Sequence, residues 1–201
     1  MEKKLCAVIL AACCLLSMVG CRPSDVDGQN TIGLMELTDE QRQVLEAVST
    51  EKESAYIFSV QAAYTDAAFW AETYRDGEKI ETKPIQLEFH DEEGKAADGT
   101  FALVAAQGAD TEWSLIYTGR NGAKIFYTGT VEQQPEHLAS ASAALEPPCT
   151  IVDGQEIVLY ARAFFSGTAV RAFGTQDFLS PDRLREFEYV HLLKCRFQNA
   201  P

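Results

Sequence analysis

The stretch 189–197, YVHLLKCRF, has the clearest strand pattern in the chain. Successive side chains of a strand point to opposite faces, so hydrophobicity with a period of two predicts a strand with one buried face. The second face begins with hydrophobic residues and ends with Lys194 and Arg196, which we expect to point into solvent. The strand is therefore predicted to lie at the centre of the core. Its inward face carries Tyr189, His191, Leu193, Cys195 and Phe197.

Shorter alternating runs precede this strand along the chain. Two of their connections contain Asp76-Gly77 and Asn121-Gly122, and such dipeptides between strand-like runs are typical of β-hairpins. About nine short strands joined by turns predict an all-β fold, an antiparallel β-sandwich. Apart from 189–197, the predicted strands cover residues 56–64, 67–74, 85–89, 101–106, 112–117, 124–131, 156–164 and 169–173.

Three segments between these runs follow other patterns. Thr38 and Gln41 form a capping box in front of a predicted helix over residues 39–50. Ser180-Pro181 has the cap and the first-turn proline of a second, short helix. Residues 133–148 are rich in Ala, Ser and Pro without alternation, so we expect a long connection that crosses between the two sheets.

The start of the chain predicts export and a lipid anchor. Two lysines precede the apolar run 5–19, which is the order of a signal peptide and is too short for a spanning helix. Met18-Val19-Gly20-Cys21 resembles the lipobox of bacterial lipoproteins. The resemblance implies cleavage after Gly20, a diacylglyceryl group on the Cys21 thiol and attachment to the extracytoplasmic face of the cell membrane. The alternative is an ordinary signal peptide with a chance cysteine.

These features divide the chain into three parts. Residues 1–20 are the predicted signal peptide. Residues 21–33 are the acylated cysteine and a polar, flexible tether, because RPSDVDGQNTIG is almost free of hydrophobic side chains. Residues 34–201 are the predicted single β-sandwich domain, and a segment of that length can bury one good core.

The mature part of the chain also carries a resemblance. The polar tether, the hairpin turn Asp76-Gly77-Glu78-Lys79 and the closing YVHLLKCRF resemble small uncharacterised lipoproteins of Gram-positive bacteria. The resemblance agrees with a position in the cell envelope, and it implies no activity.

The cysteines leave one open question. Of six cysteines, three lie in the predicted signal peptide and Cys21 is the acylation site, so Cys149 and Cys195 remain for the domain. Export permits a disulfide between them, whereas the inward position of Cys195 suits a buried free thiol. Their number and spacing do not fit a zinc site, and we expect no metal.

Charge and motifs exclude several classes of function. The formal net charge of −13 argues against nucleic acid as a partner. The chain contains none of G-x-S-x-G, H-E-x-x-H or G-x-x-x-x-G-K-[ST], so we predict neither catalytic residues nor a cofactor. Of the three histidines, His191 is expected to be a hydrogen-bonded core residue. Trp70, which is adjacent to Phe69, and His90, in an acidic loop, are the candidates for a binding surface.

The sequence therefore favours a membrane-anchored, non-catalytic domain that binds an envelope protein or a glycan, or acts as a scaffold. Two alternatives stay open. One is an extracytoplasmic hydrolase that uses scattered carboxylates such as Asp91 and Glu93, and the other is an accessory or sensor subunit of a membrane complex. A pocket that gathers carboxylates or a histidine favours an enzyme, whereas a flat aromatic patch favours binding.

Overall fold

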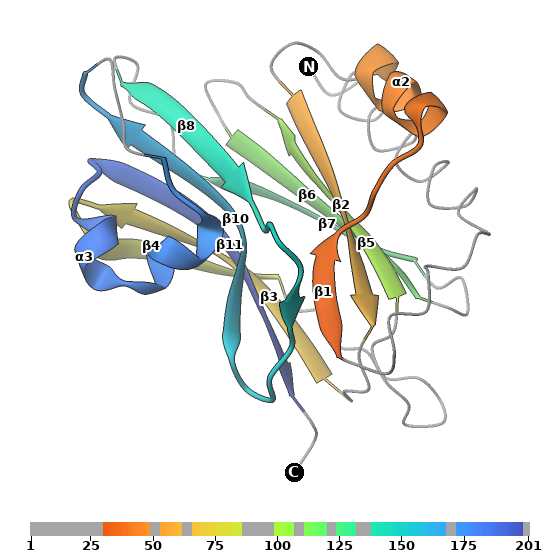
Figure 1. Ribbon diagram of the computed structural model, residues 1–201. Helices are drawn as coiled ribbons and strands as arrows, with labels where there is room; N and C mark the ends of the chain where they lie inside the picture. Colours follow the sequence, from red (N-terminus) through yellow and green to blue (C-terminus); the bar gives the residue numbers. More distant parts are fainter. Residues whose placement is uncertain are drawn as a thin grey trace.

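Figure 1 shows the computed structural model, which describes residues 30–48, 53–61, 66–85, 99–106, 111–119, 124–131, 138–167 and 172–198. Three helical segments occur in these residues, α2 (Asp39–Val48), the 3-10 helix η1 (Thr175–Leu179) and α3 (Pro181–Leu184). The strands are β1 (Thr31–Leu34), β2 (Glu53–Gln61), β3 (Asp66–Arg75), β4 (Glu78–Ile85), β5 (Gly99–Ala106), β6 (Thr111–Gly119), β7 (Lys124–Val131), β8 (Ala139–Ala144), β9 (Cys149–Thr150), β10 (Glu156–Phe165) and β11 (Tyr189–Gln198).

The strands form two antiparallel sheets that pack against each other (Figure 1). The six-stranded sheet has the order β7-β6-β5-β2-β1-β9, and the five-stranded sheet has the order β4-β3-β11-β10-β8. The predicted all-β fold, an antiparallel β-sandwich with peripheral helices, is confirmed. The capping box is also present, because Gln41 N–H donates to Thr38 Oγ1 at 3.2 Å and Thr38 N–H donates to Gln41 Oε1 at 2.9 Å.

The predicted strand over residues 85–89 shares only Ile85 with β4, and residues 86–89 lie outside the described residues. The structure also has three strands that the sequence pattern does not predict, because they lack a readable period. β1 has 4 residues and β9 has 2, which is too short for alternation to show. The third, β8, has the sequence ASASAA, in which both residue types are small.

The predicted tether is too long by three residues. Thr31 pairs with Gln61 of β2, and Ile32 is fully buried, so the domain begins at Thr31 instead of Leu34. Gly33 allows this part of the predicted tether to pack closely against Pro148. A Cβ atom at Gly33 would lie 2.6 Å from Pro148 Cβ, and only glycine permits so close an approach.

The predicted connection over residues 133–148 does cross between the sheets, although its described part is mostly strand. β8 pairs with β10 in the five-stranded sheet, and Leu145 N–H continues this pairing to Leu159 O at 2.8 Å. Four residues later, Cys149 pairs with Ile32 of β1 in the other sheet. One segment thus contributes edge strands to both sheets.

The strand predicted over residues 169–173 is wrong where the structure describes it. Ala172 and Phe173 lie outside any strand. Phe173 instead packs its ring against Phe178 and Phe187, with ring centroids 5.0 and 5.6 Å apart. Aromatic packing after the chain leaves β10 therefore overrides the local strand pattern.

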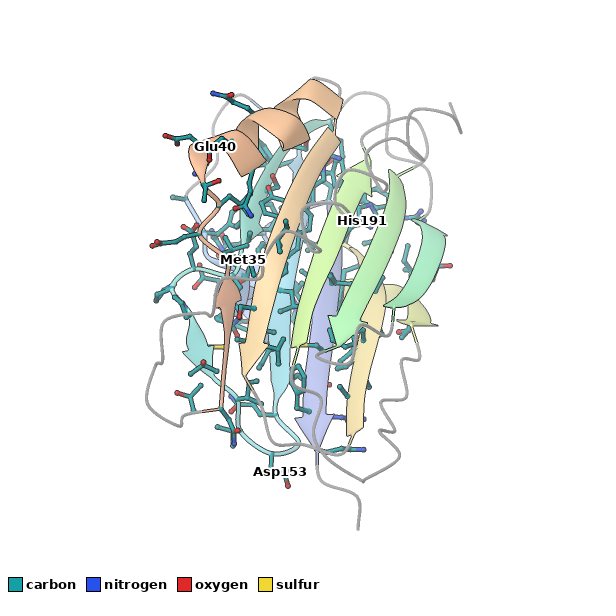
Figure 2. All side chains as sticks on the ribbon, turned by 90° about the vertical axis from the view of Figure 1, so that its right-hand side faces the viewer. Met35, Glu40, Asp153 and His191 are labelled. Carbon is teal, nitrogen blue, oxygen red and sulfur yellow. The ribbon has the colours of Figure 1, made fainter. Side chains whose placement is uncertain are left out.

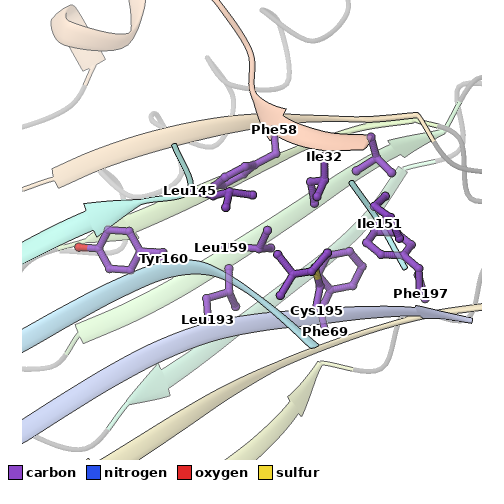
Figure 3. Close-up of a cluster of buried hydrophobic side chains, with 13 residues drawn as sticks. Ile32, Phe58, Phe69, Leu145, Ile151, Leu159, Tyr160, Leu193, Cys195 and Phe197 are labelled. Atoms are coloured by element: carbon purple, nitrogen blue, oxygen red, sulfur yellow. The ribbon is translucent and has the colours of Figure 1, made fainter. Parts of the chain in front are cut away.

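β11 is the central strand of its sheet, as predicted, with β3 on one side and β10 on the other. Its inward residues Leu193 and Cys195 are fully buried between the sheets. Figure 3 shows the cluster that they join, to which both sheets contribute. The cluster consists of Ile32, Phe58, Val60, Ala67, Phe69, Leu145, Ile151, Ile157, Leu159, Tyr160, Leu193, Cys195 and Phe197.

A second hydrophobic cluster covers the outer face of the five-stranded sheet. Val190 and Leu192 of β11 lie there under the segment that contains η1 and α3. From that segment Phe178, Leu184 and Phe187 pack onto the sheet. The sheet is therefore covered on both faces near the start of β11, which is the pattern that the sequence predicts.

The structure corrects the expectation for Lys194. Its side chain is only 6% exposed on this outer face, and it forms an ion pair with Glu72 of β3 at 2.7 Å. A lysine can occupy such a position because a carboxylate on the neighbouring strand compensates its charge.

We expect Leu193→Ala to lower the free energy of unfolding by about 2–5 kcal/mol, because it removes buried methyl groups and leaves a cavity. Leu179→Ala is the matched control. Leu179 is 42% exposed in η1, so the same truncation there should cost less than about 0.5 kcal/mol. Urea unfolding of the two variants measures the difference, and equal losses would contradict the central position of β11.

Candidate functional site

The outer face of the five-stranded sheet holds a compact charge network around Glu72, whose side chain is 3% exposed. Its carboxylate accepts hydrogen bonds from Tyr74 Oη at 2.6 Å and Trp70 Nε1 at 3.1 Å. It also forms ion pairs with Lys194 Nζ at 2.7 Å and Lys79 Nζ at 2.5 Å. We call Trp70, Glu72, Tyr74, Lys79 and Lys194 the outer network.

The electrostatics of the outer network follow from these contacts. Burial alone would raise the pKa of Glu72, but hydrogen bonds from Lys194, Lys79 and Tyr74 outweigh it and lower this pKa to about 2. Burial, followed by the hydrogen bond to Glu72, raises the pKa of Tyr74. Glu72 is therefore ionised at neutral pH with four donors around its two oxygens. Such a carboxylate stabilises the sheet and is poorly suited to take up a proton in a reaction.

Trp70, a predicted binding residue, belongs to this network. Its side chain is half-buried, and its N–H group is directed to Glu72. The Arg196 guanidinium carbon lies 5.9 Å from the centroid of its ring. The other predicted binding residue, His90, lies outside the described residues, and so does the predicted lipid attachment site, Cys21.

A second polar group occupies the inner face of the same sheet. The strand register aligns Ser142, Arg162, His191 and Thr73 across four neighbouring strands, and we call these residues the inner polar row. Glu81 of β4 follows Thr73 at the end of the row. The apolar cluster between the sheets fills the adjoining part of this face, from Leu193 toward the end of β11. The inner face thus changes from apolar to polar halfway along the strands.

His191 is a buried, neutral imidazole, in agreement with the prediction of a hydrogen-bonded core histidine. It is 1% exposed, and its Nδ1 shares a hydrogen bond of 3.2 Å with Thr73 Oγ1. Figure 2 labels the position of His191 in the domain. Its Nε2 is buried without a hydrogen-bond partner. Burial, assisted by the positive charge of Arg162, lowers the pKa of His191 to about 4. The ring is therefore uncharged at neutral pH.

Arg162 is the charged member of the inner polar row. It is 7% exposed, and one guanidinium nitrogen donates to Ser140 Oγ at 3.0 Å. The guanidinium carbon lies 5.0 Å from the centroid of the Phe164 ring. Burial lowers the pKa of Arg162, as expected for a cation in a poorly hydrated position.

The two cysteines of the domain are free thiols in the structure, so the disulfide that the sequence permits between Cys149 and Cys195 is not formed in it. Cys195 is fully buried in the apolar cluster, and Cys149 is half-buried against the same cluster. Burial raises the pKa of the Cys149 thiol, and it raises that of Cys195 further. The alternative that the sequence left open, a buried free thiol at Cys195, describes this arrangement.

The part of the chain that the structure describes contains no group of three or more His, Cys, Asp or Glu side chains that could hold a metal ion. Its helices are all too short or too polar to cross a membrane.

These features define the class of protein: an antiparallel two-sheet β domain with a charge network on one face of a sheet and a buried polar row on the other. A family model for the YgaN domain matches residues 31–194, and the chain belongs to the YgaN domain family. The match begins at Thr31, the first residue of β1. No curated protein and no solved structure matches the chain.

The sequence patterns did not identify Glu72, Lys194 or Arg162 as members of buried polar groups. A signal for Glu72 exists, since it is a charged residue between Trp70 and Tyr74 on one face of a strand. Arg162 has a similar signal, because Tyr160 and Phe164 flank it at a spacing of two. In each case the partner comes from a distant strand, and local spacing cannot supply it.

The lowered pKa values of His191 and Glu72 predict that the free energy of unfolding decreases as the pH falls, over two adjoining pH ranges. The unfolded His191 imidazole takes up its proton near 6.5 and the folded one only near 4, so stability is lost as the pH falls between these values. The Glu72 carboxylate takes up its proton near pH 4.5 in the unfolded chain and only near pH 2 in the folded protein. Stability is therefore also lost as the pH falls through this lower range. Each shift corresponds to on the order of 3 kcal/mol.

Urea unfolding between pH about 7 and about 3 separates the two contributions. His191→Gln should flatten the upper window, and Glu72→Gln should flatten the lower one. Each variant serves as the control of the other. A pH dependence that neither variant changes would contradict the two assignments.

Iodoacetamide labelling tests the state of the cysteines. Without a reductant, we expect both Cys149 and Cys195 to react after unfolding. In the folded protein Cys195 should stay unlabelled, because it is 0% exposed and its thiolate is scarce. Mass spectrometry of the peptides reports each site. If labelling of the unfolded chain requires prior reduction, the two residues form a disulfide.

Proposed function

We propose that this protein is a membrane-anchored extracytoplasmic lipoprotein and that its β-sandwich is a non-catalytic binding domain. The anchor rests on the signal-like start of the chain and the lipobox around Cys21. The binding role rests on the arrangement of polar groups in the fold.

The topology supports an anchor at one end of the sandwich. Ile151 N–H donates to Asn30 O, and Gly154 N–H donates to Phe197 O, so the start of β1 and the end of β11 lie at the same end (Figure 1). The sequence predicts a flexible tether here, and nine residues of such a tether, 22–30, would span about 17 Å. A strand of 10 residues such as β11 is about 33 Å long. The end that contains Asn30 should therefore face the membrane, with the start of β11 farther away.

The inner polar row is the observation that carries the binding role. Nucleophilic catalysis with a histidine requires an acid that orients the ring, but His191 has Thr73 and Arg162 beside it. The carboxylate of Glu72 is occupied by its four donors in the outer network. A buried cation next to an unpartnered ring nitrogen suits the holding of a ligand better than the transfer of a proton.

For the exposed faces, an envelope protein or a glycan stays the predicted class of partner. The hydrolase alternative depends on Asp91 and Glu93, which lie outside the described residues. No described residue adds support to that alternative.

Fractionation of cells tests the anchor. Cys21→Ser should move the protein from the membrane fraction to the soluble fraction, because the thiol is the proposed site of lipid attachment. Cys149→Ser is the matched control and should leave the protein in the membrane fraction. If the Cys21 variant stays in the membranes after a salt wash, the lipid anchor is wrong.

A further inference from the structure

Three basic side chains are buried in the described part of the chain, and they differ in their partners. Lys194 forms ion pairs with Glu72 at 2.7 Å and Glu156 at 3.2 Å. Arg183, which is 8% exposed, forms an ion pair with Glu186. Arg162 is buried to the same degree, yet no described carboxylate pairs with it.

The nearest acid of its own row is too far away to compensate Arg162. Glu81 stands three strands from Arg162, which is about 14 Å at the usual spacing of strands. A buried cation without a nearby anion is costly, because desolvation of the charge is not offset. The position therefore calls for a negative group that the described residues do not supply.

The immediate surroundings of Arg162 offer hydrogen-bonding groups for such an anion. Of the five N–H donors of a guanidinium, one is directed to Ser140 Oγ, and no second described acceptor contacts the group. On the neighbouring strand, His191 Nε2 is buried and unpartnered. Ser140 is exposed on the edge strand β8, which gives the guanidinium a side toward solvent.

Aromatic rings border the row on both sides. Along β10, Tyr160 and Phe164 flank Arg162 on the inner face, and the Phe164 ring meets the His191 ring edge-on at 5.2 Å. From the opposite sheet Tyr56 packs against Tyr160, with ring centroids 5.2 Å apart.

We propose that the inner polar row binds the carboxylate of a small organic acid whose body is apolar, with Arg162 as its main partner and Ser140 and His191 beside it. A carboxylate fits the guanidinium because two of its N–H groups can donate to the two oxygens in parallel. The aromatic neighbours favour an apolar body over a fully hydrated inorganic ion. This inference rests on the proposed binding function and names its ligand class.

Titration with phenylacetate and phenylacetamide tests the proposal. The two molecules have nearly the same shape, and only the first carries a charge. We use the full chain, purified from membranes in an uncharged maltoside detergent, and measure binding by calorimetry. Phenylacetate should bind at least about tenfold more tightly than phenylacetamide, since the charge-assisted pair is the stronger one. Equal affinities, or no binding of phenylacetate, would overturn the proposal without any variant.

Two matched variants then test the residue. Arg162→Met should weaken phenylacetate binding at least about tenfold, and Arg183→Met should change it less than about twofold, because Arg183 already has Glu186 as its partner. Circular dichroism checks that both variants are folded. Equal losses in the two variants would overturn the assignment to Arg162. If the protein is membrane-anchored but binds phenylacetate and phenylacetamide equally well, the ligand class inferred here is wrong, whereas the proposed anchor stands.

Discussion

The ion pair between Glu72 and Lys194 is the interaction on which the rest of the five-stranded sheet depends. Both side chains are almost fully buried on the outer face, 3% and 6% exposed, and they lie on adjacent strands at the centre of the sheet. Removal of one partner from such a pair leaves a desolvated charge, which typically costs about 3–5 kcal/mol. The pair marks the point where the apolar cover over Val190 and Leu192 ends and the polar part of that face begins.

The same pair helps to fix the register of β11 against β3. Lys194 is opposite Trp70, and Glu72 is opposite Leu192, so the two charges are diagonal neighbours across the strands. A slip by one residue would turn Lys194 into the apolar cluster and Leu193 out of it. Hydrophobic burial on one face and charge pairing on the other therefore select a single alignment, which also brings His191 next to Thr73 and Arg162.

The two faces of this sheet use buried polar groups in different ways. On the outer face the buried carboxylate of Glu72 is matched by Lys194 and Lys79, which gives stability and leaves it little capacity for a ligand. On the inner face Arg162 has a hydroxyl and a ring beside it, and the neutral His191 has an unpartnered nitrogen. Buried polar groups without partners often have a functional role, and for Arg162 and His191 we have inferred ligand binding. The short tether predicted after Cys21 is consistent with a domain that binds close to the membrane.

The sequence by itself determined the all-β class, the hairpin at Asp76-Gly77, the capping box of α2 and the central strand 189–197, because each depends on contacts or periodicity within a few residues. Only the tertiary structure decided the rest. In β10 the register shifts between Val158 and Tyr160, so simple alternation does not hold across the strand. The burial of Lys194 and the crossing of β8 and β9 between the sheets depend on strands distant in the chain. Alternation reports how polar a face is, but the partners on that face come from the fold.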